Sequence, residues 1–250
     1  MDELSEETVI AAVSPWVAEI RYLESALSTN TVAAEWAANG ARHGSLVIAK
    51  HQTAGRGRLD RTWHSDPADG LAFTMVLDPE QLGIEPGLIN AAVAVAVCRA
   101  LRGAVLDVRI KWPNDLVIAD RKIAGILSEL VTNNSGDPIA VVGVGINVND
   151  ATFPEEIEGA TSLFIETGAR FDRTKVLADV LQTMKMPQSK ASLTERFTHM
   201  CSTIGREVSV TSADGSTRIG VAAGIDQRGG LLLADGEIFY AGDVVHLRTT

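Results

Sequence analysis

The sequence has few cysteines, no long apolar run and no basic start. Its two cysteines, Cys98 and Cys201, give no reason to expect a disulfide, which points to a reducing compartment. The first residues, M-D-E-L-S-E-E-T, are acidic and lack the basic and apolar parts of a signal peptide. The apolar stretch 88–98 is too short to cross a bilayer and contains Asn90. We therefore expect a cytoplasmic protein with no membrane partner.

Positive charge is also scarce. The chain has 22 Lys and Arg residues against 32 Asp and Glu, a net charge of −10, which argues against a general binder of nucleic acids or membrane surfaces. Its 250 residues suffice for one large domain, or one large and one small. Hydrophobic residues at 46% and charged residues at 22% are ordinary for a soluble globular protein. There is no internal repeat and no low-complexity segment.

Against this acidic average, the segment Lys50–Trp63 is basic. It reads K-H-Q-T-A-G-R-G-R-L-D-R-T-W and sets one lysine and three arginines against a single acid, Asp60. Glycine allows the backbone to approach a ligand and exposes N–H donors, and the arginine fork matches carboxylate or phosphate oxygens. The segment thus predicts an anion site. A solvated surface loop with scattered charge is the alternative that composition alone allows.

The first half of the chain predicts strands and helices on both sides of this basic segment. They are a strand over Ala18–Glu24, a helix that begins at Ser28 or Thr29 and stops near Gly40, strands over Ser45–Ala49 and Leu71–Leu77, and a helix over Pro86–Gly103. The order brings Ser28–Asn30 and Gln52 toward the basic segment. Simple helix capping also explains Ser28–Asn30.

The second half predicts a meander followed by helices and a small barrel. Four successive strands with tight turns are expected over Val108–Trp112, Asp115–Ala119, Lys122–Val131 and Ile139–Val148, and two helices over Asp172–Met186 and Lys190–Cys201. From Glu207 onward short β-like runs alternate with Gly/Asp turns, which is typical of a small barrel whose boundary lies at 202–205. The expected fold class is α+β with a mixed, largely antiparallel sheet.

Lysines and glycines inside the predicted strands are candidates for chemistry. Lys111 and Lys122 interrupt apolar strands, and such a lysine either reaches solvent or meets an anion. Gly125, Gly143 and Gly145 lie where glycine weakens packing, which often marks a ligand pressed against the backbone. The G-V-G-I-N stretch lacks G-x-G-x-x-G spacing and no P-loop lysine is present, so these dinucleotide and phosphate motifs are excluded.

Four motifs in a fixed order carry a family resemblance. They are G-R-G-R-x-x-R-x-W (Gly55–Trp63), K-W-P-N-D (Lys111–Asp115), K-I-A-G-I-L (Lys122–Leu127) and G-x-G-I-N-V (Gly143–Val148). With S-T-N at Ser28–Asn30, the chain resembles the biotin protein ligases, also called biotin–[acetyl-CoA-carboxylase] ligases, from about Ser25 to its C-terminus. Fewer than thirty residues precede Ser28, so we expect the ligase-only type without an N-terminal DNA-binding domain.

The resemblance implies a fold and a reaction. Residues 1–203 would form a catalytic domain like those of class II aminoacyl-tRNA synthetases and biotin ligases, and residues 204–250 an SH3-like β-barrel. The biotin carboxylate would attack the α-phosphate of ATP with Mg²⁺, giving biotinyl-5′-AMP and pyrophosphate. A lysine of a biotin carboxyl carrier domain of an acyl-CoA carboxylase would then take the biotinyl group. A monomer or weak homodimer, without nucleic acid, is expected.

Site residues follow by the same resemblance. The catalytic residues would be Lys122, Arg58 and Asp115; the biotin-binding residues would be Ser28, Thr29, Asn30, Gln52, Gly55, Arg56, Gly57, Arg58, Lys122, Gly125, Gly143 and Gly145; and the ATP-binding residues would be Arg58, Arg61, Trp63, Asn114, Asn147 and Lys122. Asp115 would hold Mg²⁺ or take a proton from the carrier lysine, although a turn residue after Pro113 explains it equally well. Trp63 would stack on adenine rather than sit in the core.

Two alternative functions remain open. A lipoate–protein ligase would share the fold and the lysine, but the G-R-G-R-x-x-R-x-W loop favours biotin. An RNA-binding module could use the basic segment with Trp63, but the acidic balance opposes it.

The basic segment has few apolar anchors, so we expect it to become ordered only when biotin or the adenylate binds.

Overall fold

A computed structural model describes residues 4–59, 61–64, 68–105, 107–185, 190–212 and 214–247. A large sheet is built from β1 (Ile20–Ala26), β2 (Ser45–Gln52), β3 (Gly70–Leu77), β4 (Arg109–Lys111), β5 (Asp115–Ile118), β6 (Arg121–Thr132) and β7 (Pro138–Asn147). The helices are α1 (Glu6–Val13), α2 (Thr29–Ala38), α3 (Pro79–Leu82), α4 (Pro86–Leu101), α5 (Leu163–Thr167), α6 (Arg173–Met184) and α7 (Lys190–Met200).

The large sheet is mixed, with strand order β1-β2-β3-β7-β6-β5-β4. Strands β1 and β2 run parallel, and the other neighbours are antiparallel. The predicted fold class is therefore confirmed, and β4 to β7 form the expected meander. The two helices predicted in the first half of the chain are present as α2 and α4, over residues 29–38 and 86–101. Each has an alanine-rich interior, which favours a helix. Helices α1, α3 and α5 were not predicted.

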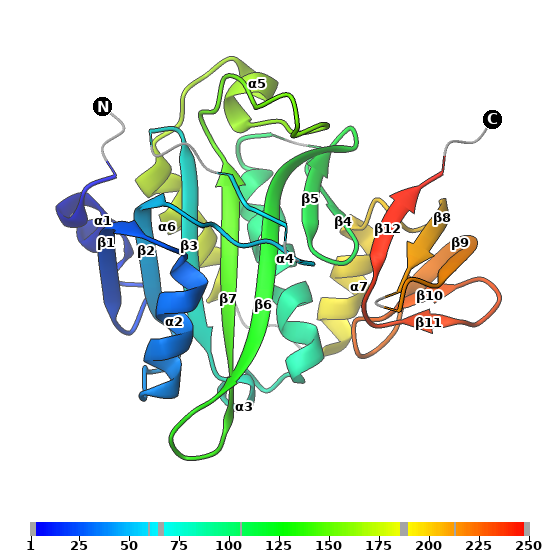
Figure 1. The fold of residues 1–250 in the computed structure, drawn as a ribbon, viewed down its shortest axis with the longest axis horizontal. Helices are drawn as coiled ribbons and strands as arrows, with labels where there is room; N and C mark the ends of the chain where they lie inside the picture. Colours follow the sequence, from blue (N-terminus) through cyan, green and yellow to red (C-terminus); the bar gives the residue numbers. More distant parts are fainter. Residues whose placement is uncertain are drawn as a thin grey trace.

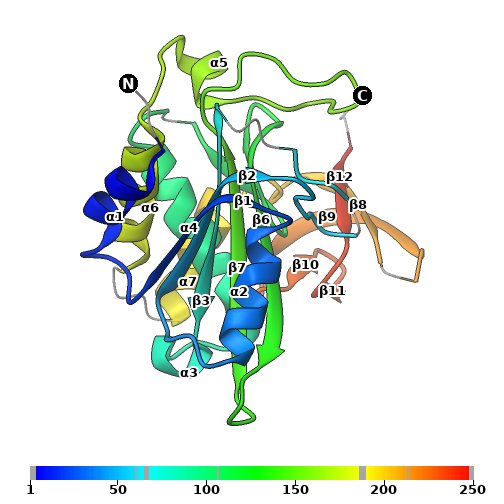
Figure 2. The ribbon, with the colours of Figure 1, turned by 60° about the vertical axis from the view of Figure 1, so that its left-hand side comes forward.

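The two faces of the sheet are covered differently. Among the described helices, α2 is the one that packs on the first face, where Ala33 and Ala37 meet a small apolar cluster of the sheet. Helices α4, α6 and α7 lie on the opposite face, over the large core (Figures 1 and 2). Side chains alternate along a strand, so residues 125, 127, 129 and 131 of β6 and 141, 143, 145 and 147 of β7 share the α2 face. Because α2 is short, it leaves the part near 125 and 145 open for another segment.

Both cysteines are buried and are free thiols, as expected for a chain without a disulfide. Burial raises the pKa of Cys98 to about 11, so this thiol is an inert core group. Among the described helices, none combines the length and the apolar character that crossing a bilayer requires.

A second, small sheet follows the last helix. It consists of β8 (Glu207–Thr211), β9 (Thr217–Ile225), β10 (Leu231–Leu233), β11 (Ile238–Phe239) and β12 (Asp243–His246), in the order β11-β10-β9-β8-β12 with antiparallel neighbours. Each strand coincides with a predicted β-like run, because the Gly/Asp turns separate them clearly.

The small sheet is joined to the large one through polar contacts at Thr203. This residue is fully buried, and its hydroxyl accepts a hydrogen bond from the backbone N–H of Trp112 at 3.1 Å. His246 of β12 places Nε2 at 3.1 Å from the same hydroxyl, and its Nδ1 lies 3.0 Å from Nη1 of Arg206 and 3.3 Å from Oδ1 of Asp120. The imidazole therefore lies between Thr203 and an arginine–aspartate pair. Burial, reinforced by Lys111 and Arg206, lowers the pKa of His246, while Asp120 opposes the shift.

This joint predicts a loss of stability in mild acid. The pKa of His246 is lower in the folded chain than its ordinary value of 6.5, so the unfolded chain takes up the proton first as the pH falls. Stability should be complete above about pH 6.5 and should decline below it. Burial lowers the pKa of His43 too, and it contributes with the same sign.

Urea unfolding at pH 7.5 and 5.5 measures the effect. His246→Gln, which retains a donor near Thr203, should reduce the difference between the two pH values, and His43→Asn should remove a further part. An undiminished difference in the His246→Gln variant would contradict this account.

Candidate functional site

The basic segment forms a narrow hairpin, which we call the arginine strap (residues 53–63). The backbone N–H of Trp63 donates to the carbonyl of Gly55 at 2.9 Å, and that of Gly57 donates to the carbonyl of Arg61 at 2.7 Å. A Cβ on Gly55 would lie 2.4 Å from the Trp63 carbonyl oxygen, so glycine is required for this pairing. The strap leaves β2 and crosses the α2 face of the sheet, in front of β7 and β6 (Figure 1). Asp60 lies outside the described residues.

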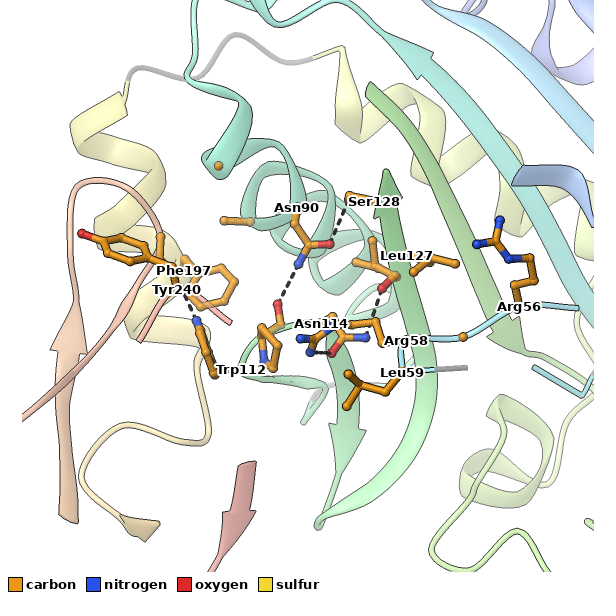
Figure 3. A pocket seen from close by; sticks show the side chains of 16 residues that line it. Arg56, Arg58, Leu59, Asn90, Trp112, Asn114, Leu127, Ser128, Phe197 and Tyr240 are labelled. Atoms are coloured by element: carbon orange, nitrogen blue, oxygen red, sulfur yellow. Dashed lines mark hydrogen bonds between the residues drawn. The ribbon is translucent and has the colours of Figure 1, made fainter. Parts of the chain in front are cut away.

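Arg58 reaches from the strap to the junction with the small sheet. Its Nη1 donates to Oδ1 of Asn114 at 3.0 Å (Figure 3). The same nitrogen donates to the carbonyl of Gly242 at 3.3 Å. These acceptors are neutral. Burial lowers the pKa of Arg58, whereas Asp115 and Asp243 raise it from a distance. A partly desolvated guanidinium with neutral hydrogen-bond acceptors is a favourable position for an incoming anion.

The other two arginines of the strap are already paired with carboxylates. Arg61 Nη2 lies 2.6 Å from Asp243 Oδ2, and Arg56 Nη2 lies 2.8 Å from Glu129 Oε1. The bond between Arg61 and Asp243 raises the pKa of the arginine and lowers that of the carboxyl group. Exposed pairs of this kind contribute about 0–1 kcal/mol each. They nevertheless fix where the strap attaches.

Lys122 lies under the strap, in the same slot as Arg58. Its Nζ is 2.7 Å from Oδ1 of Asp115 and 5.6 Å from the centre of the Trp63 ring. The lysine–aspartate contact falls outside hydrogen-bonding angles, so it is an ion pair without an aligned hydrogen bond. The Lys122 side chain is 38% exposed. It therefore combines access to the slot with proximity to the strap.

A resident metal site is not built by the described residues. No group of three or more His, Cys, Asp or Glu side chains among them could hold a metal ion. Asp115 is the carboxylate that sequence analysis named, and Lys122 pairs with one of its oxygens. Mg²⁺ commonly takes one or two carboxylates together with substrate phosphates and water. Such an ion would therefore come with the nucleotide, and Asp115 could supply one oxygen.

The glycines of the sheet form a floor that is occupied by the protein itself. A Cβ on Gly145 would lie 2.2 Å from Cε2 of Trp63, and one on Gly125 would lie 3.1 Å from Cζ3 of the same ring. The indole thus rests on both glycines, and the slot retains a volume of only about 50 Å³. Its Nε1 is buried without an acceptor among the described residues. An unpaired buried donor costs about 1–3 kcal/mol, which a ligand could recover.

Polar groups line the end of the slot near α2. The backbone N–H and the hydroxyl of Thr29 lie 2.8 and 3.1 Å from Oε1 of Gln52. This contact orients the Gln52 amide and leaves its Nε2 toward the strap, near Gly55. Ser28 stands at the N-cap position of α2, but its hydroxyl makes no capping bond. Simple capping therefore does not account for Ser28, which lines the slot.

Asn30 is held by protein groups on both sides of its amide. Its Nδ2 donates to the carbonyl of Leu127 at 3.1 Å and to Oε2 of Glu129 at 3.0 Å. Its Oδ1 accepts from the hydroxyl of Thr74 at 2.7 Å. A Cβ on Gly143 would lie 2.0 Å from this Oδ1, so the asparagine lies directly on that glycine. The geometry makes Asn30 part of the wall of the slot.

The two other asparagines named by sequence analysis differ in their placement: Asn114 lines the slot, whereas Asn147 lies outside its lining. Asn114 holds Arg58 through Oδ1 and donates from Nδ2 to the carbonyl of Ile126 at 3.0 Å. Asn147 is buried and donates to the carbonyl of Thr161 at 2.9 Å. Both side chains tie the site to neighbouring backbone.

A larger cavity of about 400 Å³ adjoins the slot on the other side of Arg58 and Asn114. It lies where the strap, α4, α7 and the small sheet meet, and its walls include Leu59, Asn90, Trp112, Phe197 and Tyr240 (Figure 3). The bond between Arg58 and Asn114 separates the two spaces. The slot and the cavity are thus neighbouring compartments with a shared wall.

Sequence analysis missed three residues of the site. Thr74 is fully buried in β3, bonded to Asn30 and lying 2.8 Å from the Thr29 hydroxyl. It could have been noticed as the one polar residue in L-A-F-T-M-V-L, and Glu129 similarly as a carboxylate in a largely apolar strand. Asp243 gave no signal, because it lies at the start of β12, 182 positions from Arg61.

Comparison with known proteins places this arrangement in a family. The profile of the Biotin/lipoate A/B protein ligase family matches residues 22–149, and that of the biotin protein ligase C terminal domain matches residues 203–247. The chain is 32% identical to the biotin–[acetyl-CoA-carboxylase] ligase of Mycobacterium tuberculosis, over 99% of this chain and 96% of that protein. It is 35% identical to the bifunctional ligase/repressor BirA of Bacillus subtilis, over 84% of this chain and 67% of that one.

A solved structure gives the same result. The biotin protein ligase from Aquifex aeolicus in complex with biotin and ATP superposes with a TM-score of 0.77 at 29% identity, covering 92% of this chain and 99% of that one. The sequence matches, the sheet order and the slot under the strap therefore agree: the chain belongs to the biotin/lipoate A/B protein ligase family.

Proposed function

We propose that the chain is a biotin protein ligase that activates biotin with ATP to biotinyl-5′-AMP and then biotinylates a lysine of a carrier domain. The observation that carries this proposal is the joint placement of Arg58 and Lys122 beside the Thr29–Gln52 pair in one slot. Residues 1–203 act as the catalytic domain and residues 204–250 as an SH3-like domain. The match to a biotin ligase C-terminal domain favours biotin over lipoate.

The first step brings two anions together. A biotin carboxylate oxygen attacks the α-phosphorus of ATP, the bond to the β,γ-diphosphate breaks, and pyrophosphate leaves. Arg58 has neutral acceptors and half-buried surroundings, so its charge is available to the phosphate and carboxylate oxygens. Lys122 exchanges its contact with Asp115 for these oxygens as negative charge develops. Asp115 would hold a Mg²⁺ ion bound with the nucleotide, and such an ion would supply further charge neutralisation.

The polar end of the slot recognises the ureido ring of biotin. Gln52 is oriented through Oε1 by Thr29, so its Nε2 donates toward the ligand. The Ser28 hydroxyl, which makes no capping bond, adds a second polar contact. The apolar ring lies over the glycines of β6 and β7, where no side chain of the sheet intervenes. Arg56, Gly55 and Gly57 cover the ligand from the strap.

Trp63 leaves the floor when the ligands bind. The remaining volume of about 50 Å³ is far below the roughly 300–1,000 Å³ of ordinary ligand pockets. The displaced indole stacks on adenine, and its Nε1 gains an acceptor. Arg61, Asn114 and Asn147 surround the nucleotide. The expectation that ligands order this segment stays a prediction.

The second step transfers the biotinyl group. The carrier lysine amine attacks the carbonyl carbon of the mixed anhydride, AMP leaves, and the amine loses a proton that Asp115 accepts. The acceptor is a carrier domain of an acyl-CoA carboxylase. The enzyme acts in the cytoplasm as a monomer or weak homodimer.

Removing the lysine charge tests the chemistry. We expect Lys122→Ala to lower biotin-dependent exchange between pyrophosphate and ATP by about 100-fold or more, because one preorganised charge contact is lost. Lys175→Ala is the matched control, since Lys175 is an exposed lysine that pairs with Asp179 on α6. Mass spectrometry of a carrier domain incubated with biotin and ATP reports the second step. Exchange that needs lipoate instead of biotin, or none at all, refutes the proposed function.

Moving Trp63 tests the account of the floor. Gly145→Ala should push the indole away and cost about 1–3 kcal/mol of stability, because its Cβ would lie 2.2 Å from the ring. Gly125→Ala, with 3.1 Å, should do less. Acrylamide quenching of tryptophan fluorescence measures the exposure of the Trp63 indole, once the signal of the other tryptophans, measured in Trp63→Phe, is subtracted. If saturating biotin and ATP leave the Trp63 emission of the wild type unchanged, the indole does not move and the account is wrong.

A further inference from the structure

Glu129 is the carboxylate that connects the arginine strap to the biotin end of the slot. It lies on β6 between Leu127 and Val131, on the α2 face of the sheet, and its side chain is 30% exposed. Its Oε1 and Oε2 accept from the two terminal nitrogens of Arg56 at 2.8 and 3.2 Å. This is a bidentate pair, which fixes the direction of the guanidinium as well as its distance.

The same carboxylate also holds α2. Oε2 of Glu129 accepts from Nδ2 of Asn30 at 3.0 Å, and Asn30 follows Thr29 at the start of the helix. Thr29 in turn orients Gln52. One side chain thus joins the strap, the helix start and β6. A shift of Glu129 would therefore move both the strap and the start of α2, the two sides of the slot that accept biotin in the proposed function.

We propose that Glu129 is a positioning residue for the biotin half of the site, an assignment that rests on the proposed function. Glu129 holds Arg56 across the slot and neutralises it, so the negative charge of the substrates meets Arg58 and Lys122 instead. Figure 3 shows Arg56 and Arg58 leaving the strap at separate places, with Arg58 beside Asn114. Without the carboxylate, the cover over the biotin ring would lose its attachment to the sheet.

Asp243 provides the matched comparison at the other end of the strap. It holds Arg61 by the same kind of ion pair, at 2.6 Å, but from β12 of the small sheet and away from Thr29 and Gln52. Each carboxylate therefore serves a different half of the site. Neutralising Glu129 should disturb biotin, and neutralising Asp243 should disturb the nucleotide.

The experiment compares Glu129→Gln with Asp243→Asn in pyrophosphate–ATP exchange. For Glu129→Gln we expect the KM for biotin to rise about tenfold, equivalent to about 1.4 kcal/mol, with kcat and the KM for ATP within about threefold of wild type. For Asp243→Asn the KM for ATP should rise and that for biotin should stay. Glu129→Asp, which retains the charge, should recover part of the biotin affinity.

Controls separate positioning from folding. The melting temperature of Glu129→Gln should stay close to that of Glu195→Gln, a substitution of an exposed residue on α7. An unchanged or lower KM for biotin in Glu129→Gln overturns the proposal, and so does an equal rise for biotin and ATP. A lower KM would mean that the carboxylate competes with the substrate for Arg56. If the wild type itself shows no biotin-dependent exchange, the proposed function fails, and this is visible before any variant is compared.

Discussion

The attachment of three arginines to oxygens from three separate parts of the chain determines the shape of the site. Arg56 is held by β6, Arg58 by the loop after β4 and the turn before β12, and Arg61 by the carboxylate at the start of β12. A glycine-rich hairpin with little apolar burial gains little stability from packing, and ordering it costs about 1–2 kcal/mol per residue. Exposed ion pairs offset only part of that cost. The attachments of the strap therefore contribute only a small net stability.

The three attachments differ in charge, and this difference organises the chemistry. Arg56 and Arg61 each face a carboxylate, so their charges are largely balanced before a substrate arrives. Arg58 bonds to an amide oxygen and a backbone carbonyl, which orient it without neutralising it. Lys122 faces Asp115 through a short contact that lacks hydrogen-bonding alignment. Among the three arginines of the strap, Arg58 is thus the one without a paired carboxylate, and it lies in the same slot as Lys122. In the proposed function this is where the two substrate anions meet.

The local parts of this arrangement could be predicted, and the long-range parts could not. Turn residues and strand periodicity locate the meander and the five strands of the small sheet within a residue or two, because both are set by neighbours in the sequence. Helix α1 also has a local signal, a capping box formed by Ser5 and Thr8. This signal was not recognised in the acidic N-terminal segment. The pairing of Arg61 with Asp243 depends on how two sheets dock, and no local pattern encodes that.

What occupies the space above Gly125 and Gly145 could not be predicted from the sequence. Glycines at 125 and 145 indicate that something must approach the backbone of β6 and β7 closely, but a sequence cannot say what. Protein interiors tolerate few voids, so the space above these two glycines has to be filled. Trp63 fills it here, at the cost of an indole N–H without an acceptor. In the proposed function the biotin ring replaces the indole on the same two glycines, and the displaced Nε1 gains the acceptor that it lacks here.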